Sequence, residues 1–473
     1  MLMKRKFCFL VHLTLFIIAS SVFASNPPVH HALTITLDPS QSIGRFHDVI
    51  TIPRSILQSI PGFRLNKNSK IERVELDGKK VPAENSDDGF LKFTLPQYSK
   101  EGLADPLKVV CDYTLPLPIA NGNMETLFIS GADYFYLQPT MESKTNFRVT
   151  FQIKIQTPAN LKAISQGEKL KDIVENGNRT VIWEEDKPQE EILLIADHYH
   201  EFFNRHESIA LYAYLRDADN ALAKKYFEAT RSYIDLYSKL IAPYPYKKFA
   251  LVENSRQTGY GMPSFTLLGS RVIRFPFILH TSYPHEILHN WFGNGVYIDA
   301  DSGNWAEGLT SYLSDHILPE QKGKGDRYRF QELMKYANYV NEMNDFPLAE
   351  FKGRDNMASQ AVGYGKTLMV LHMLRLEVGD TLFLQALRDF YNQNQFHYAG
   401  FKELRISFER TSKRALKKFF NQWTLRKGGP QLRLSSASKS KQNGQHLLKL
   451  EIRQTQFDPA FKLKLPIAVW LKE

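Results

Sequence analysis

The sequence predicts an α+β protein with a β-rich N-terminal part, a mainly helical middle part and a short β segment at the end. Up to about residue 205, apolar and polar residues alternate over short segments separated by turn signals, as in half-buried strands. From residue 206 the apolar spacing becomes about 3.6, the period of an amphipathic helix. After residue 430 strand-like alternation returns. We therefore divide the chain into residues 1–24, 25–205, 206–430 and 431–473.

Composition limits the possible partners. The chain has 473 residues, of which 43% are hydrophobic and 12% aromatic, as expected for two or three folded domains. Its formal net charge is +10, but the basic residues are scattered, and no Lys/Arg block is interleaved with aromatic residues. The composition therefore argues against nucleic-acid binding, and it predicts no particular oligomeric state.

Residues 1–24 have the pattern of a secretory signal peptide. A basic start at Lys4-Arg5-Lys6 precedes an apolar run from Phe7 to Ile18, and Val22-Phe23-Ala24 fits a small-residue cleavage site. An uncleaved membrane anchor is the alternative, because the apolar run is long. Cleavage would remove Cys8 and leave Cys111 without a partner for an intrachain disulfide. We therefore expect that the protein is exported, either to the bacterial periplasm or out of the cell. It would contact the membrane only if the leader is uncleaved.

The N-terminal part, residues 25–205, is predicted to be a β-sandwich or saddle. Short strands follow one another with turn signals between them, which is the pattern of sandwich domains. The clearest predicted strands are Ala32–Leu37, Asp48–Ile52, Ile71–Leu76 and Phe147–Ile155. The last of these has the most regular alternation of apolar and polar residues.

The middle part begins with a strand at Ile209–Leu215 and a long amphipathic helix at Leu222–Leu240, which ends before Pro243. Further helices are predicted at Met334–Met343, Leu368–Leu376, Leu382–Tyr391, Phe401–Thr411 and Ala415–Leu425. The final strands lie on either side of Gln442-Asn443-Gly444.

Two histidines lie four residues apart in the segment His285-Glu286-Ile287-Leu288-His289. On a helix such residues share one face, so both imidazoles can reach the same metal ion. The predicted helix starts at Ser282 as N-cap, has Pro284 in its first turn and stops at Gly293-Asn294-Gly295. Its apolar side consists of Ile287, Leu288, Trp291 and Phe292. The pattern is typical of a zinc site in which Glu286 acts as general base.

A catalytic zinc ion takes three protein ligands and keeps one position open. Glu307 is the candidate for the third ligand, because it opens a second predicted amphipathic helix just after Asn304. The inward face of that helix is predicted to hold Leu309, Tyr312, Leu313 and Ile317. A capping-box partnership with Asn304 is the alternative role for Glu307. We predict that His285, His289 and Glu307 hold one Zn²⁺ ion.

These motifs resemble those of the aminopeptidase N family of gluzincin metallopeptidases. That family has His-Glu-x-x-His, then a Trp-Gly-Asn-type segment, then Trp-Leu-Asn-Glu-Gly-Phe-Ala-Ser-Tyr. The chain has His289-Asn290-Trp291-Phe292-Gly293-Asn294, followed by Trp305-Ala306-Glu307-Gly308-Leu309-Thr310-Ser311-Tyr312. The gap between His289 and Glu307 holds 17 residues, one fewer than is usual in the family. A deletion in the connecting loop explains the difference, because both flanking segments keep their patterns.

The resemblance implies a thermolysin-like catalytic domain and assigns further residues. Tyr364 matches a family tyrosine that donates a hydrogen bond to the oxyanion formed during hydrolysis. Gln138 matches a glutamine that helps to bind the amino group of the substrate. Gly259, Tyr260, Gly261 and Met262 lie in the segment similar to the family's Gly-x-Met-Glu-Asn, which runs along the substrate. Here Pro263 replaces the glutamate that binds the free amine, and Ser264 replaces the asparagine.

The expected function is hydrolysis of peptide bonds in a peptide or protein substrate, in an aminopeptidase-like manner. Because of Pro263, an endopeptidase or another zinc hydrolase that does not recognise a free amine is an alternative. A non-catalytic peptide-binding protein of the cell envelope is a further alternative, although the intact segment from His285 to His289 argues against it.

Overall fold

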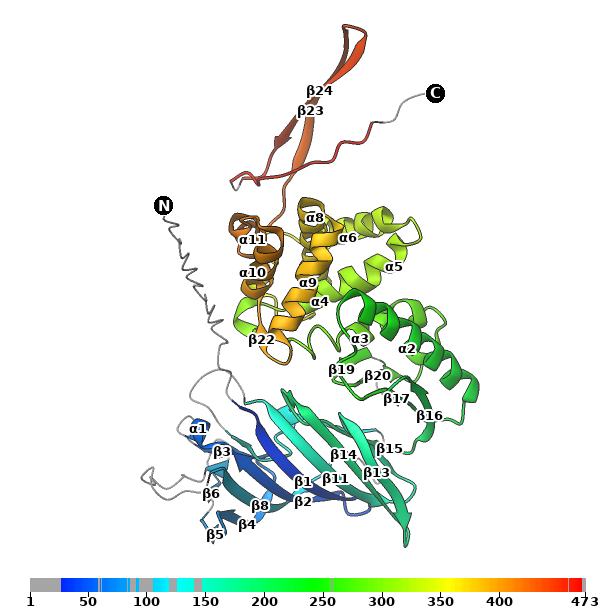
Figure 1. Ribbon diagram of the computed structural model, residues 1–473, viewed down its shortest axis with the longest axis vertical. Coiled ribbons are helices and arrows are strands. Elements are labelled where there is room, and N and C mark those ends of the chain that lie inside the picture. Colours follow the sequence, from blue (N-terminus) through cyan, green and yellow to red (C-terminus); the bar gives the residue numbers. More distant parts are fainter. Residues whose placement is uncertain are drawn as a thin grey trace, which may run out of the picture.

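The computed structural model describes residues 27–57, 60, 62–82, 84–85, 91–92, 105–118, 126–139, 147–255, 257, 259–457 and 459–469. The predicted leader, residues 1–24, lies outside these ranges. In Figure 1 the N-terminal sheets form one end of the molecule, a smaller sheet and the helices form the middle, and a β-hairpin forms the other end. This order of β-rich, helical and β segments confirms the predicted fold class.

An eight-stranded sheet dominates the N-terminal part, with the order β13-β14-β11-β1-β2-β8-β4-β5. All neighbouring strands are antiparallel except the parallel pair β1 and β11. The strands are β1 Val29–Asp38, β2 Ile43–Ile52, β4 Lys70–Leu76, β5 Lys79–Lys80, β8 Leu107–Pro116, β11 Val149–Pro158, β13 Glu168–Glu175 and β14 Asn178–Gln189. Each long central strand alternates buried and more exposed residues, as its sequence predicts.

Smaller elements complete the N-terminal part. A three-stranded sheet joins β12 Lys162–Ile164, β15 Leu194–Asp197 and β9 Leu127–Ile129. Two-stranded sheets pair β10 Gln138–Pro139 with β3 Phe63–Arg64, and β6 Glu84–Asn85 with β7 Leu91–Lys92. Short helical turns occur at α1 Arg54–Leu57 and at Gly131–Asp133. Cys111 is a buried free thiol on β8.

A five-stranded sheet separates the two large hydrophobic cores. Its order is β16 His200–His206, β17 Ile209–Leu215, β18 Lys248–Asn254, β20 Phe265–Gly269 and β19 Gly259–Met262, so β19 lies at an edge. On one face Tyr212, Val252 and Leu267 join the core of the N-terminal strands. On the other face Leu211 and Leu251 join the core of the helices. The sheet therefore lies between both cores and contributes to each, and among the described strands only β20 pairs with its edge strand β19.

The helices lie on the side of the second face of this sheet, where α2 and α3 pack directly against its strands (Figure 1). They are α2 Asn220–Leu240, α3 Ser282–Leu288, α4 Trp305–Ser311, α5 Ile317–Glu320, α6 Gly325–Tyr339, α7 Met357–Gln360, α8 Thr367–Val378, α9 Asp380–Asn394, α10 Phe401–Ser412 and α11 Lys417–Thr424. π-Helical segments at Tyr312–His316 and Ala361–Lys366 follow α4 and α7. Single 3-10 turns lie at Val272–Arg274, Ile278–His280, Ala300–Ser302 and Leu348–Glu350, and β21 Tyr297–Ile298 pairs with β22 Tyr398–Ala399.

Two helix predictions are wrong in their bounds. The helix α3 ends at Leu288 instead of reaching Phe292, with His289 as its C-cap and Thr281 rather than Ser282 as N-cap. Trp291 and Phe292 are still fully buried, which is why they resembled a continuing helix face. The helix predicted at 334–343 is α6, which spans 325–339, and Met343 beyond its end is exposed.

The chain closes with the hairpin of β23 Leu432–Gln442 and β24 Gln445–Gln454 (Figure 1). Its turn residues Asn443 and Gly444 both have positive φ, 48° and 79°, as a tight hairpin turn requires. Among the described residues, no helix combines the length and apolar character needed to cross a bilayer.

Candidate metal centre

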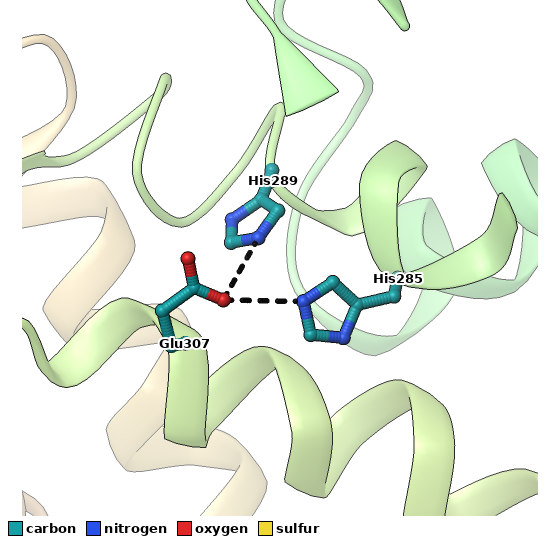
Figure 2. Close-up of side chains that lie close together, drawn as sticks. All are labelled: His285, His289 and Glu307. Atoms are coloured by element: carbon teal, nitrogen blue, oxygen red, sulfur yellow. Dashed lines mark hydrogen bonds and ion pairs between the residues drawn. The ribbon is translucent and has the colours of Figure 1, made fainter. Parts of the chain in front are cut away.

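The structure brings His285, His289 and Glu307 together at the junction of α3 and α4. The Nε2 atoms of His285 and His289 lie 3.3 and 3.5 Å from Oε2 of Glu307. Figure 2 shows both imidazoles turned toward this one carboxylate oxygen. One donor atom from each residue lies within 4.8 Å of the other two, close enough to surround one ion. Two nitrogens and one carboxylate oxygen form the donor set of a zinc site with an open fourth position.

The backbone explains how α4 delivers its carboxylate. Asn304 is the N-cap of α4, and its Oδ1 accepts a hydrogen bond from the backbone N–H of Glu307 at 3.4 Å. Glu307 therefore sits in the first helical turn with its side chain free to point at the histidines. The capping contact uses the N–H of Glu307, so it is compatible with a metal-ligand role for the carboxylate.

Both histidines are fixed through their second nitrogen. His285 Nδ1 lies 3.0 Å from Oδ2 of Asp315, and His289 Nδ1 donates to the carbonyl oxygen of Phe292 at 2.9 Å. Such partners set the tautomer and leave Nε2 for the metal. Asp315 is not among the residues predicted from the sequence. Its position eight residues after Glu307, about two helical turns on, was the signal that could have indicated it.

Charge coupling within the cluster is strong. Burial would lower the pKa of His285, but the charge of Asp315 and its hydrogen bond outweigh burial and raise this pKa well above its usual range. The pKa of His289 is also raised, because Glu307 outweighs the effect of burial. Conversely, burial would raise the pKa of Glu307, but the two imidazoles hold it well below its usual value. Without a metal the cluster is thus an ion-paired network, and a divalent cation would replace its protons.

Glu286 lies against the edge strand β19. A Cβ atom on Gly261 would stand 3.0 Å from Oε2 of Glu286 and 2.9 Å from both its backbone oxygen and His289 Cβ. A Cβ on Gly259 would stand 3.4 Å from Oε1 of Glu286. The two glycines therefore allow β19 to approach the carboxylate closely. Burial raises the pKa of Glu286, a property expected of a general base.

Tyr364 reaches the same cluster from the π-helical segment Ala361–Lys366. Its ring stacks on His285 with centroids 6.3 Å apart, and its hydroxyl hydrogen-bonds to Glu307. Burial, followed by the negative charge of Glu307, raises the pKa of Tyr364, so the hydroxyl is a proton-bearing donor. Close packing fixes this segment, since a Cβ on Gly308 of α4 would stand 2.9 Å from the carbonyl oxygen of Gly363.

The predicted substrate-binding residues divide into two groups. Gly259 to Met262 form β19, whose Tyr260 side chain is 49% exposed. Tyr260 and Met262 line a cavity of about 160 Å³, together with Thr126, Phe128, Ile195, Asn254, Ser255 and Leu267. Gln138, in contrast, donates its side-chain amide to the carbonyl of Gly131 within the N-terminal part. Its role in substrate binding stays a prediction.

A second group of possible metal ligands, His316, Glu320 and His372, is less suited to a cation. Arg329 Nη1 lies 2.8 Å from His316 Nε2, and Arg375 Nη1 donates to Oε2 of Glu320 at 2.6 Å. The two positively charged guanidinium groups thus already contact atoms of His316 and Glu320 that would otherwise bind a cation. Burial and the neighbouring arginines lower the pKa of His372 to about 4. The cluster at His285 is therefore the better candidate for zinc.

Comparisons with known proteins agree with this assignment. Residues 280–423 match the family model for the peptidase family M1 domain. The chain is 22% identical over 349 residues to Aminopeptidase M1 of Arabidopsis thaliana, which covers 66% of this chain and 37% of that protein. It is 25% identical over 165 residues to the mitochondrial Aminopeptidase 2 of Saccharomyces cerevisiae, covering 33% and 17%. The chain thus spans well under half the length of these curated relatives.

Solved structures show the same fold. The M1 zinc metallopeptidase from Deinococcus radiodurans superposes with a TM-score of 0.67 at 16% identity, covering 84% of this chain and 94% of that chain. A mutant of the metallopeptidase from that organism, bound to a Tyr-Ser-Ala substrate, gives a TM-score of 0.65 at 16% identity, covering 85% and 96%. Together with the family match, these relatives favour the aminopeptidase-like prediction over the two alternatives.

Proposed function

We propose that the chain is a member of the aminopeptidase N, or M1, family of zinc metallopeptidases and that it hydrolyses peptide bonds in an aminopeptidase-like manner. The convergence of His285, His289 and Glu307 carries the proposal. These three side chains would hold one zinc ion. Bound there, zinc would polarise the scissile carbonyl and lower the pKa of a coordinated water to about 7.

The remaining chemistry belongs to side chains around the cluster. Glu286 takes the proton of the attacking water and delivers it to the leaving amine. The close approach of β19 to its partly buried carboxylate supports this role, because a peptide extended along β19 would lie beside it. Tyr364 donates its hydroxyl hydrogen to the carbonyl oxygen as negative charge develops there. The contact between Tyr364 and Glu307 supports this role, since it places the hydroxyl beside the ligands.

The edge strand β19 is the proposed binding surface for the substrate backbone. An extended peptide can add to its unpaired side by main-chain hydrogen bonds. Residues on β19 alternate, so Gly259 and Gly261 face Glu286 while Tyr260 and Met262 face the cavity. A peptide bound along this edge would present its scissile bond to Glu286 and a neighbouring side chain to the cavity.

Replacing Glu286 by Gln tests the general base. We expect zinc content and thermal stability close to wild type, while turnover of a peptide substrate falls by about 10²–10⁴-fold. Glu342→Gln makes the same chemical change on an exposed side chain and should leave turnover unchanged. Normal hydrolysis by Glu286→Gln would overturn the assignment.

Recognition of a free amine is tested with one peptide in free and N-acetylated forms. An aminopeptidase hydrolyses the free form and not the blocked one, and this is the result we expect. Pro263 cannot supply a carboxylate for the amine, so other groups near the end of the substrate must do so. Equal hydrolysis of both forms would contradict the aminopeptidase mode and leave zinc hydrolysis intact.

We further propose that the protein is exported to the periplasm or secreted. The basic and apolar pattern of residues 1–24 supports this location. Cell fractionation together with N-terminal sequencing tests it. A mature chain that starts at Ser25 is the expected result, and a full-length chain in the cytosol would refute the proposal.

A further inference from the structure

Lys248 on β18 is a fully buried lysine that the hydrolytic mechanism does not use. Its ammonium Nζ donates to Ser264 Oγ at 2.8 Å and lies 5.1 Å from the ring centre of Trp183. Burial lowers the pKa of Lys248 to about 7, partly opposed by the nearby Glu185. Lysine is rarely buried completely, so a position that keeps one in a core calls for a reason beyond packing.

Ser264 is the point at which three segments meet. It lies in the turn between β19 and β20, is fully buried and has a φ of +66°, which is unfavourable for a residue with a Cβ atom. Its Oγ accepts from Lys248 and also from the backbone N–H of Gly167, in the N-terminal part, at 3.1 Å. Its own N–H donates to Oδ1 of Asn290 at 2.9 Å. The hydrogen bonds thus hold the turn in a conformation that the sequence alone disfavours.

Asn290 connects this turn to the metal ligands, because it directly follows His289. Its Nδ2 donates to the carbonyl of Ile287 at 2.9 Å, and its Oδ1 accepts from the Tyr244 hydroxyl at 3.2 Å. The same hydroxyl lies 2.9 Å from the carbonyl oxygen of Lys248. The single hydroxyl proton of Tyr244 serves one of these two oxygens at a time, so Lys248, Ser264, Asn290 and Tyr244 form a chain of polar contacts between β18, the β19–β20 turn and the segment that carries His289.

A second hydrogen bond joins the metal-binding segment to β19 itself. Asn294 Nδ2 donates to the carbonyl oxygen of Gly261 at 3.0 Å, and Gly261 is the glycine of β19 that lies closer to Glu286. The strand is consequently held to the metal-binding segment at two places, at Gly261 and at the turn. Since β19 is an edge strand, it has a neighbouring strand on one side only, and these side-chain links determine how far it stands from Glu286.

We propose that Lys248 and Ser264 are positioning residues for hydrolysis, which fix β19 relative to Glu286 and the zinc ligands. The inference rests on the proposed peptidase function. Neither residue touches the ligands or the substrate edge directly. Their effect passes through the turn and through Asn290, so it alters the geometry of the reacting groups and not the metal affinity.

A purely structural role and a positioning role for Lys248 predict different results for the variant Lys248→Met. Methionine has a similar length and no desolvation cost, and Ser264 Oγ keeps the N–H of Gly167 as partner, so the melting temperature should hold or rise. A positioning role adds a fall in kcat of about tenfold, because small displacements of reacting groups reduce turnover strongly. KM and zinc content should change by less than about twofold.

Three further variants make the test decisive. Ser264→Ala should lower kcat as Lys248→Met does, and the double variant should lose no more than the worse single variant, because both break one linkage. Ser264→Gly removes Oγ and also the cost of a positive φ for a residue with a Cβ atom. If kcat is still reduced in this variant, the hydrogen bond between Lys248 and Ser264 Oγ is the cause. Lys169→Met is the matched control, since Lys169 is a mostly buried lysine over Tyr212 whose ammonium pairs with Glu201, and the kcat of this variant should be unchanged.

The outcomes separate this inference from the function on which it rests. If the wild-type protein with zinc hydrolyses no peptide, both proposals are overturned. If it hydrolyses peptides while Lys248→Met and Ser264→Gly retain wild-type kcat, the positioning role alone is refuted. If Lys248→Met does not fold, Ser264→Gly decides the question by the same measurement.

Discussion

Adding one methyl group at Gly261 tests whether the spacing between β19 and Glu286 controls catalysis. In Gly261→Ala the new Cβ would stand 2.9 Å from the backbone oxygen of Glu286, 2.9 Å from His289 Cβ and 3.0 Å from Glu286 Oε2. Two of these atoms belong to the backbone or to a Cβ and cannot rotate away. Ordinary carbon contacts begin at about 3.5 Å, so β19 has to retreat by roughly 0.5 Å or more.

The size of the effect follows from that displacement. Overpacking of this kind costs about 1–3 kcal/mol of stability. A shift of about 1 Å in reacting groups can cost 10²-fold in rate, so kcat/KM should fall by about 10–100-fold, or about 1.4–2.7 kcal/mol. The zinc ligands stay in place, so zinc content should remain at one ion per chain.

The assay is steady-state hydrolysis of one peptide, with zinc measured on the same samples. Gly259→Ala is the control, because its Cβ would meet Leu268 Cδ2 at 3.3 Å and Glu286 Oε1 at 3.4 Å, both nearly ordinary contacts. Neither glycine has a positive φ, so alanine fits the backbone at both positions and only space differs. Gly259→Ala should stay within about threefold of wild type. Wild-type kcat/KM for Gly261→Ala, with zinc bound, would refute the reasoning.

Three other predictions concern the cluster. Asp315→Asn should weaken zinc binding by about 10–100-fold in a chelator competition, because Asp315 orients His285; an unchanged zinc affinity would contradict this role. Tyr364→Phe should keep zinc and KM but lower kcat by about 10²–10³-fold, and a change confined to KM would assign Tyr364 to substrate binding instead. The pKa values of His285 and His289 are raised in the metal-free cluster. Protons therefore compete with zinc for these imidazoles already at pH values above 6.5, which is about the usual imidazole pKa. Zinc affinity measured as a function of pH should therefore begin to fall above pH 6.5 as the solution is acidified; a constant affinity down to pH 6 would be inconsistent with these shifts.

Local periodicity predicted many helices and strands because each of them buries the apolar residues of one face. The strand Ile209–Leu215 is β17 with the same bounds, and the helix predicted at 222–240 is α2. The rule fails at α6. There Glu332 is buried while Phe330, Leu333 and Met334 are exposed, so the apolar residues do not mark the inward face and the predicted helix starts nine residues too late.

The metal ligands of the candidate site were predictable from the sequence, whereas the residues that position them were not. His285, His289 and Glu307 form a short motif with a chemical logic that sequence spacing preserves. Asp315 acts from a π-helical segment, and its spacing of eight residues from Glu307 indicates only a shared helix face, not the contact with His285. The contacts of Lys248 with Ser264 and of Asn294 with Gly261 join residues that are far apart or unremarkable in type. Such contacts exist only once the sheet is assembled.

The placement of β19 shows why the chemistry and the choice of substrate can change separately. One side of the strand offers Gly259 and Gly261 to Glu286, and the absence of side chains there is what the metal segment requires. The other side offers Tyr260 and Met262 to a cavity whose remaining walls come partly from N-terminal residues such as Phe128. Because alternate residues of one strand serve the two purposes, substitutions on the cavity side can alter which side chain fits without moving Glu286. Pro263 lies in the turn beyond this strand, and it is not one of the grouped ligands His285, His289 and Glu307.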